Sequence, residues 1–106
     1  MKPLPVTPKL LNVARRVVWF REPAEELTEP VHFLAHVMTY GTVEDLEAIK
    51  GMVGPNDFCE VLENAPPGIF DSRSWAYWNL KCGRYPAPPL PTRAGLGPVR
   101  PSPAGR

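Results

Sequence analysis

The segment "MTYGTVEDLEAI", residues Met38 to Ile49, decides the fold because it holds the end of one predicted helix and the start of the next. Gly41 is expected to close the first helix in the left-handed conformation that glycine adopts without strain. Thr42 and Asp45 have the spacing of a capping box, in which each side chain bonds the other residue's backbone N–H group. Beyond this cap, the apolar residues at helical spacing are Val43, Leu46, Ile49 and Val53. The pattern predicts two helices joined by a short turn.

Further helices flank this junction, and prolines and glycines mark their ends. The upstream helix begins at Pro30, and proline is favoured at a first helical position. Downstream, we expect one helix from Pro55 to the prolines at 66–67 and another over residues 73–82, which Gly83 ends. The sequence therefore predicts a mainly α-helical fold, a small single-domain bundle of about four short helices.

The stretch before Pro30 has weaker signals. Residues 22–27, "EPAEEL", are expected to form a single helical turn. Residues 15–20, "RRVVWF", have no clear period, so a helix end and a short strand both remain open.

Prolines divide the chain into an extended arm at residues 1–9, a helical domain at residues 10–85 and a proline-rich tail at residues 86–106. The tail has too few large apolar side chains to offset the entropy lost on folding by itself. We expect residues 85–93 to dock as an extended ridge and the chain after Gly95 to be disordered.

The last predicted helix carries two tryptophans on one face. At about 100° per residue, Trp75 and Trp78 point the same way, whereas Tyr77 points to the far side. We expect both indoles to anchor this helix in the core, because each can bury a large apolar area. The predicted core residues are Trp19, Leu34, Met38, Leu46, Phe58, Leu62, Trp75 and Trp78.

The net charge of +1 conceals a strong segregation of charge along the chain. All 11 acidic residues lie between Glu22 and Asp71, where Lys50 is the only base, and the other bases occupy the two flanks. The favoured interpretation is that the basic flanks fold back over the acidic middle of the same molecule. The alternative is that the separated charges steer a charged partner onto one face.

The two cysteines, Cys59 and Cys82, stand far apart in the sequence. A disulfide framework of the secreted kind is not expected from such a pair, so we predict reduced, partly buried thiols. The N-terminus has no apolar run of signal-peptide length, and no segment approaches the length of a membrane span. A cytoplasmic protein without membrane contact is expected.

Motifs for catalysis or metal binding are weak. His32 and His36 have the i, i+4 spacing of a paired metal site, which Cys59 and Cys82 could complete to four zinc ligands. There is no CxxC or HExxH motif, however, and neither a phosphate-binding loop nor a nucleophile elbow is present. We expect no metal, no cofactor and no enzymatic activity, and the many carboxylates on helices are expected to form solvated faces.

Two helices joined by a glycine-containing turn also have the outline of a helix-turn-helix. The two predicted helices at residues 42–63 are acidic, and a recognition helix that approaches phosphates should be neutral or basic. Nucleic acid is therefore not favoured as a partner. A DNA-binding transcriptional regulator that uses the basic flanks remains the alternative function.

An ordered set of motifs resembles a family of short bacterial proteins of unknown function encoded beside AbiEii-type nucleotidyltransferase toxins. The motifs are "VVWF" at residues 17–20, "MTYGTVEDLEAI", "FCEVLENA" at residues 58–65 and "SRSWAYWNL" at residues 72–80. The resemblance covers residues 17–93, and the residues that carry it are Tyr40, Gly41, Thr42, Trp75 and Trp78. The chain departs from the family at "WFREP" and in its longer proline tail. The resemblance implies an antitoxin-like or accessory partner of the nucleotidyltransferase, with no catalysis of its own.

The expected function is accordingly that of a non-catalytic protein-binding module. The acidic helices are expected to meet a basic cleft of the partner, while the aromatic end of the last helix and its tail bind an apolar groove. The residues predicted to contact the partner are Glu44, Asp45, Glu47, Tyr77, Arg84, Tyr85 and Leu90.

Overall fold

A computed structural model describes residues 2–91 of the chain, so the predicted disorder after Gly95 lies outside the described residues. Within residues 2–91 the chain forms six α-helices and no strand, which confirms the mainly helical prediction. The expected number of about four helices is too low, because the weakly patterned stretch before Pro30 forms two helices. The helices are α1 (Pro8–Val17), α2 (Pro23–Glu26), α3 (Pro30–Tyr40), α4 (Val43–Ile49), α5 (Pro55–Glu63) and α6 (Ser72–Lys81). None of them is of a length and apolarity that would let it cross a membrane.

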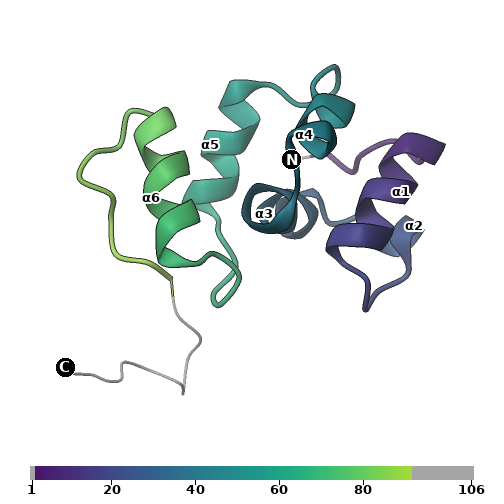
Figure 1. Cartoon of the computed structure of the whole chain (residues 1–106), viewed down its shortest axis with the longest axis horizontal. Helices are drawn as coiled ribbons and strands as arrows, with labels where there is room; N and C mark the ends of the chain where they lie inside the picture. The colour runs from purple at the N-terminus through teal and green to yellow at the C-terminus, as the bar shows by residue number, and fades with distance from the viewer. Residues whose placement is uncertain (1, 92–106) are drawn as a thin grey trace.

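Helix α3 lies at the centre and contacts each of the other five helices. In Figure 1, α1, α2 and α4 lie to the right of α3, and α5 and α6 lie to its left. Because neighbours surround α3, most of its circumference is apolar, and Phe33, Leu34 and Val37 are fully buried. One hydrophobic cluster results, which side chains from all the longer helices join.

Side-chain caps fix where several helices begin. The hydroxyl of Thr7 accepts a hydrogen bond from the backbone N–H of Leu10, so the extended arm ends at Thr7 and helix starts at Pro8 rather than residue 10. The predicted capping box of Thr42 and Asp45 is present at the start of α4. At α6, the carboxylate of Asp71 accepts a hydrogen bond from the backbone N–H of Ser74 at 2.7 Å and so caps the start of the helix.

Gly41 does not adopt the predicted left-handed conformation. Its backbone is extended, with φ −73° and ψ 161°. A Cβ atom here would lie 2.6 Å from the backbone oxygen of Val37, so the close approach of the chain requires glycine. The left-handed conformation occurs instead at Gly83, with φ 76°, two residues after the last residue of α6.

Most of the predicted core residues lie in the interior. Leu34, Met38, Leu62 and Trp75 are buried, and Leu46, Phe58 and Trp78 are partly buried against the hydrophobic cluster. The assignment of Trp19 to the core is wrong, because its side chain is 79% exposed. Helix α1 ends at Val17, and the turn that follows carries Trp19 away from the interior.

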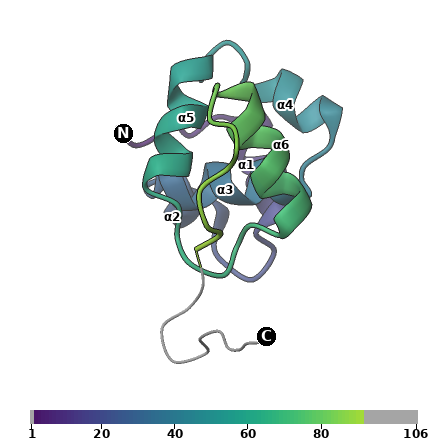
Figure 2. The ribbon, with the colours of Figure 1, turned by 90° about the vertical axis from the view of Figure 1, so that its left-hand side faces the viewer.

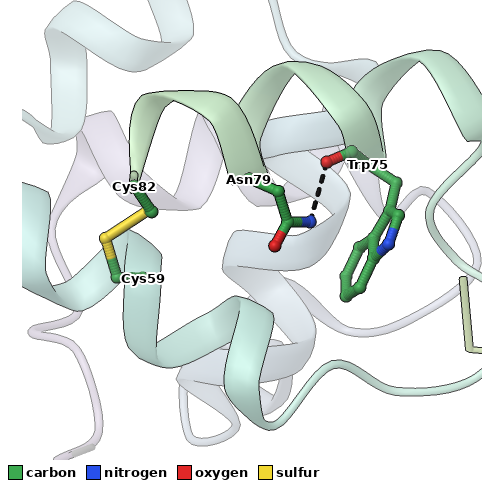
Figure 3. Close-up of a disulfide and its surroundings, with 4 residues drawn as sticks. All are labelled: Cys59, Trp75, Asn79 and Cys82. Atoms are coloured by element: carbon green, nitrogen blue, oxygen red, sulfur yellow. Dashed lines mark hydrogen bonds between the residues drawn. A yellow bond between two sulfur atoms is a disulfide. The ribbon is translucent and has the colours of Figure 1, made fainter. Parts of the chain in front are cut away.

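The prediction of free thiols is also wrong, because Cys59 and Cys82 form a disulfide. Helices α5 and α6 pack against each other and bring the two Cα atoms to 5.7 Å, although 23 positions separate them in the sequence. Figure 3 shows the disulfide joining α5 to the end of α6, with Asn79 between it and Trp75 along α6. The disulfide therefore holds the last helix to the bundle.

The chain after α6 turns back along the molecule. Figure 2 shows this segment, in yellow-green, running down the face formed by α5 and α6. The indole N–H of Trp75 donates a hydrogen bond to the carbonyl of Pro88 at 2.7 Å, and Ala87 and Leu90 pack against the hydrophobic cluster. The described start of the tail, residues 86–91, thus docks on its own domain.

Candidate functional site: an exposed aromatic groove

Three large aromatic side chains lie on the surface beside one another. Trp19 is 79% exposed, Phe20 is 56% exposed and Tyr40 is 61% exposed. Together with the imidazole of His36 they line a groove of about 460 Å³, whose remaining wall includes Arg16 and Ile69. We call this feature the aromatic groove. Large exposed apolar patches of this kind mark interaction sites on many soluble proteins.

The rings of the aromatic groove form a continuous row. The centroids of Trp19 and Phe20 are 5.6 Å apart, and the rings meet edge to face. Phe20 lies 5.8 Å from His36, and His36 lies 6.0 Å from Tyr40. These separations fall in the range that favours ring–ring contact, so the buried imidazole of His36 links the exposed rings of Phe20 and Tyr40.

Local structure explains why these four side chains meet. His36 and Tyr40 are one turn apart on α3, so both point to the same side of that helix. Trp19 and Phe20 occupy the turn between α1 and α2. Arg21, the next residue, fixes the turn through ion pairs of 3.0 Å with both Glu26 and Glu29.

Arg16, which lines the aromatic groove, joins α1 to α4 through an ion pair with Asp45. Both guanidinium Nη atoms of Arg16 donate to the carboxylate of Asp45, which is 1% exposed. Burial by itself would raise the pKa of Asp45, but hydrogen bonds from Arg16 and from the Thr42 backbone outweigh it and hold the pKa below its ordinary value. Asp45 is therefore charged at neutral pH and already paired within the molecule.

His36 is the one ionisable side chain of the ring row that lies largely inside the protein. Burial lowers its pKa below the ordinary value, an effect that the hydrogen bond to the His32 carbonyl only partly opposes. The imidazole is therefore neutral at pH 7. The aromatic groove presents an uncharged aromatic row next to the paired Arg16.

An acidic face adjoins this groove on α4, which begins three residues after Tyr40. Glu44 and Glu47 are exposed there, and Val43 beside them is 71% exposed. We call Glu44 and Glu47 the α4 acidic face. Glu44 and Glu47, both predicted contact residues, are accessible to a partner. The assignment of Asp45 as a contact residue is wrong, because Arg16 and the capping box hold its side chain in the interior.

The other predicted contact residues lie at the opposite end, around α6 and the start of the tail. Tyr77 and Tyr85 are exposed, and Arg84 is half-buried. Leu90 packs partly buried against the core of its own domain. The structure therefore does not bring these four residues together with the α4 acidic face into one site.

Sequence reasoning missed the aromatic groove. The one sequence signal for this groove was the pair Trp19 and Phe20. Both lie in a stretch without helical period, so they do not belong to an apolar helix face that could be buried. The four-ligand zinc set is not formed, because both cysteines are in the disulfide. The two histidines instead lie close to Glu26, a residue that the sequence did not single out.

The basic N-terminal flank folds back, in part, over the acidic middle of the chain. Arg16 pairs with Asp45, and Arg21 pairs with carboxylates of α2 and with Glu29. Hydrogen bonding to these carboxylates raises the pKa of both arginines, and the bond from Arg21 lowers the pKa of Glu29. These contacts support the favoured interpretation of the charge segregation for the N-terminal flank.

Comparison with known proteins identifies no relative of this chain. No protein-family model matches the chain, and no curated protein or solved structure is significantly similar to it. The fold and the surface together define a small α-helical protein with an exposed aromatic groove beside an acidic helix face.

Proposed function

We propose that this chain is a non-catalytic protein-binding module. Its aromatic groove receives an apolar side chain of a partner, and its α4 acidic face pairs with basic residues that flank that side chain. The observation that carries the proposal is the exposure of Trp19, Phe20 and Tyr40 around one groove. Tryptophan, tyrosine and arginine are the residue types that most often dominate binding energy at protein interfaces.

Charge supports a basic partner. Glu44 and Glu47 are exposed on α4, and the Arg16 guanidinium near them is already neutralised by Asp45. A positively charged surface approaching α4 therefore meets two unpaired or weakly paired carboxylates, since Lys50 is 3.8 Å from Glu47 at an exposed position. Complementary charge of this kind accelerates association and fixes the orientation of the partner.

The partner class follows from the resemblance in the sequence. An AbiEii-type nucleotidyltransferase must hold a nucleotide and its phosphates, so its active-site cleft is expected to be basic. We propose that the chain acts as an antitoxin or accessory partner in a bacterial toxin–antitoxin system and binds near such a cleft. The chain itself would then contribute binding energy and no chemical step.

The test is a binding measurement with single-residue variants. The chain is pulled down from a lysate of its native host, and quantitative mass spectrometry identifies the proteins that bind it. A purified AbiEii-type nucleotidyltransferase is then titrated with the chain by calorimetry. Trp19→Ala and Tyr40→Ala are each expected to weaken binding by about 2 kcal/mol, or roughly 30-fold, because exposed aromatic anchors are typical hot spots. Both variants should keep their free energy of unfolding to within about 0.5 kcal/mol, since the side chains lie at the surface.

Tyr77→Ala and Tyr85→Ala are the matched controls, because they remove exposed aromatic rings from the other end of the molecule. Partner binding that survives in the controls and is lost in the groove variants supports the aromatic groove. Loss in the Tyr77 and Tyr85 variants alone would move the interface to α6 and the tail. Equal binding by all four variants would contradict the proposal.

Nucleic-acid binding is the weaker proposal. Two of the five bases in the N-terminal flank, Arg16 and Arg21, have carboxylate partners in their own chain. Phosphate contacts would have to compete with these pairs. A DNA complex that persists in a gel shift at 200 mM salt would favour a transcriptional regulator instead.

A further inference from the structure

Three side chains with metal-binding chemistry meet where α2 packs on α3. Glu26 is the last residue of α2, and His32 and His36 stand one turn apart on α3. One donor atom from each residue lies within 4.8 Å of the donor atoms of the other two. Within residues 2–91, no other group of three histidine, cysteine, aspartate or glutamate residues has its donor atoms this close together.

The hydrogen bonds orient both imidazoles. Nδ1 of His36 lies 2.9 Å from the carbonyl oxygen of His32, and because a carbonyl only accepts, Nδ1 must carry the proton. Nε2 of His36 therefore keeps a lone pair that can bind a metal. Nδ1 of His32 lies 2.5 Å from Oε2 of Glu26, and this contact orients the second ring. It leaves Oε1 of Glu26 without a hydrogen bond.

Charge at this corner favours a cation. Glu26 is fully buried, and its Oε1 lies 3.0 Å from Nη1 of Arg21 without forming a hydrogen bond. The same guanidinium is shared with Glu25 and Glu29, so three carboxylates face one positive charge. Burying a carboxylate costs free energy unless it is paired. Arg21 with Glu25, Glu26 and Glu29 has a formal charge of −2, so one guanidinium does not neutralise all three carboxylates and a cation beside Glu26 would complete its pairing.

The cluster is reachable from solvent. The side chain of His32 is 25% exposed and borders a shallow depression of about 340 Å³ beside Pro66. His36 borders the aromatic groove on the other side. An ion bound here would keep open coordination positions for water or for a partner's side chain, as open zinc sites do.

We propose that Glu26, His32 and His36 form a binding site for one divalent transition-metal ion, with Zn²⁺ as the best match. A point within about 2.8 Å of all three donor atoms exists when they lie within 4.8 Å of one another, and zinc–ligand bonds are about 2.0–2.2 Å long. Side-chain movements of less than about 1 Å would therefore close the site. Imidazole and carboxylate ligands suit zinc, and the two cysteines do not compete because they are disulfide-bonded.

The test is titration of the tag-free oxidised chain with Zn²⁺ by calorimetry, together with ¹⁵N spectra of the imidazoles. Because the chain has two histidines, each ring gives its own pair of nitrogen signals. We expect one zinc ion per chain, and a shift of the metal-bound nitrogen of both rings at saturation. At a zinc concentration 100 times the Kd, the folding equilibrium constant should rise about 100-fold.

The variants Glu26→Gln and His36→Gln should weaken zinc binding at least about 10-fold. Glu63→Gln, an exposed carboxylate on α5, is the matched control and should bind zinc like the wild type. Zinc binding that leaves either histidine ring unshifted, or no zinc binding, overturns the proposal. If the Glu26 variant fails to fold, the spectra of the wild-type chain decide the question alone.

Discussion

Gly41 joins α3 to α4 with extended backbone angles, so its requirement for glycine is one of space rather than of conformation. We predict that Gly41→Ala lowers the free energy of unfolding by about 1–3 kcal/mol, because the new Cβ would lie 2.6 Å from the rigid Val37 carbonyl. Urea denaturation measures this change.

Gly51→Ala is the control for that substitution. Gly51 has no heavy atom within 4 Å of a built Cβ, and its φ is not in the left-handed region. The free energy of unfolding of the Gly51→Ala variant should equal that of the wild type or exceed it by up to about 1 kcal/mol. Equal losses in both variants would contradict the steric argument.

Asp45 makes stability depend on pH in a defined direction. Its pKa in the folded chain lies below the ordinary value of 3.8, so the Arg16 pair contributes fully above pH 3.8 and is lost as the pH falls through the folded pKa. We predict that Asp45→Asn lowers the free energy of unfolding at pH 7 by about 1–3 kcal/mol. The same variant should lose less stability than the wild type between pH 4 and pH 2, as followed by chemical denaturation at each pH.

An exposed carboxylate on α5 provides the comparison for Asp45. Glu63→Gln should leave the free energy of unfolding at pH 7 within about 0.5 kcal/mol of the wild type. If Asp45→Asn and Glu63→Gln gave the same acid profile, the Arg16–Asp45 pair would not be the source of the acid dependence.

At the scale of the elements, the disulfide sets how firmly α6 is held. A cross-link that closes a loop of 23 positions stabilises the folded state by about 3 kcal/mol through the entropy of the unfolded chain. We predict a loss of this size for the double variant Cys59→Ser/Cys82→Ser, measured by urea denaturation. Reduction of the wild type should give the same loss, and the variant itself should not respond to the reductant.

Element boundaries were largely predictable because their causes are local. The prolines at the starts of α3 and α5 and the caps at Thr42 and Asp71 act through neighbouring residues. The extent of α1 was less predictable, since "RRVVWF" has no helical period and only its first three residues are helical. The single turn predicted at residues 22–27 is present as α2.

At the scale of the whole molecule, the α4 acidic face should act on the rate of association. We predict that Glu44→Lys/Glu47→Lys slows binding to a basic partner strongly at low salt and little at high salt, since exposed charges are screened beyond about 10 Å at 0.1 M. Stopped-flow association with the partner identified by capture measures this effect. Rates that do not depend on salt in the wild type would remove the steering argument.

The candidate site lay beyond sequence reasoning for a geometric reason. The turn that carries Trp19 and the end of α3 that carries Tyr40 meet only because α1 and α3 pack together. A tryptophan in a short chain is usually a core residue, and no local signal marks this one as exposed. Likewise, the sequence around Asp45 is typical of an exposed acidic residue, and only the packing of α1 on α4 brings Arg16 close enough to pair with it.

By itself the sequence determined the helical character of the chain, most helix ends and the capping box, because each depends on residues within a few positions of one another. Only the tertiary structure decided the Cys59–Cys82 disulfide, the aromatic groove and the cluster of Glu26 with the two histidines. These features join residues from segments that are far apart in the sequence. Their positions follow from how the helices pack around α3, which no spacing along a single segment can specify.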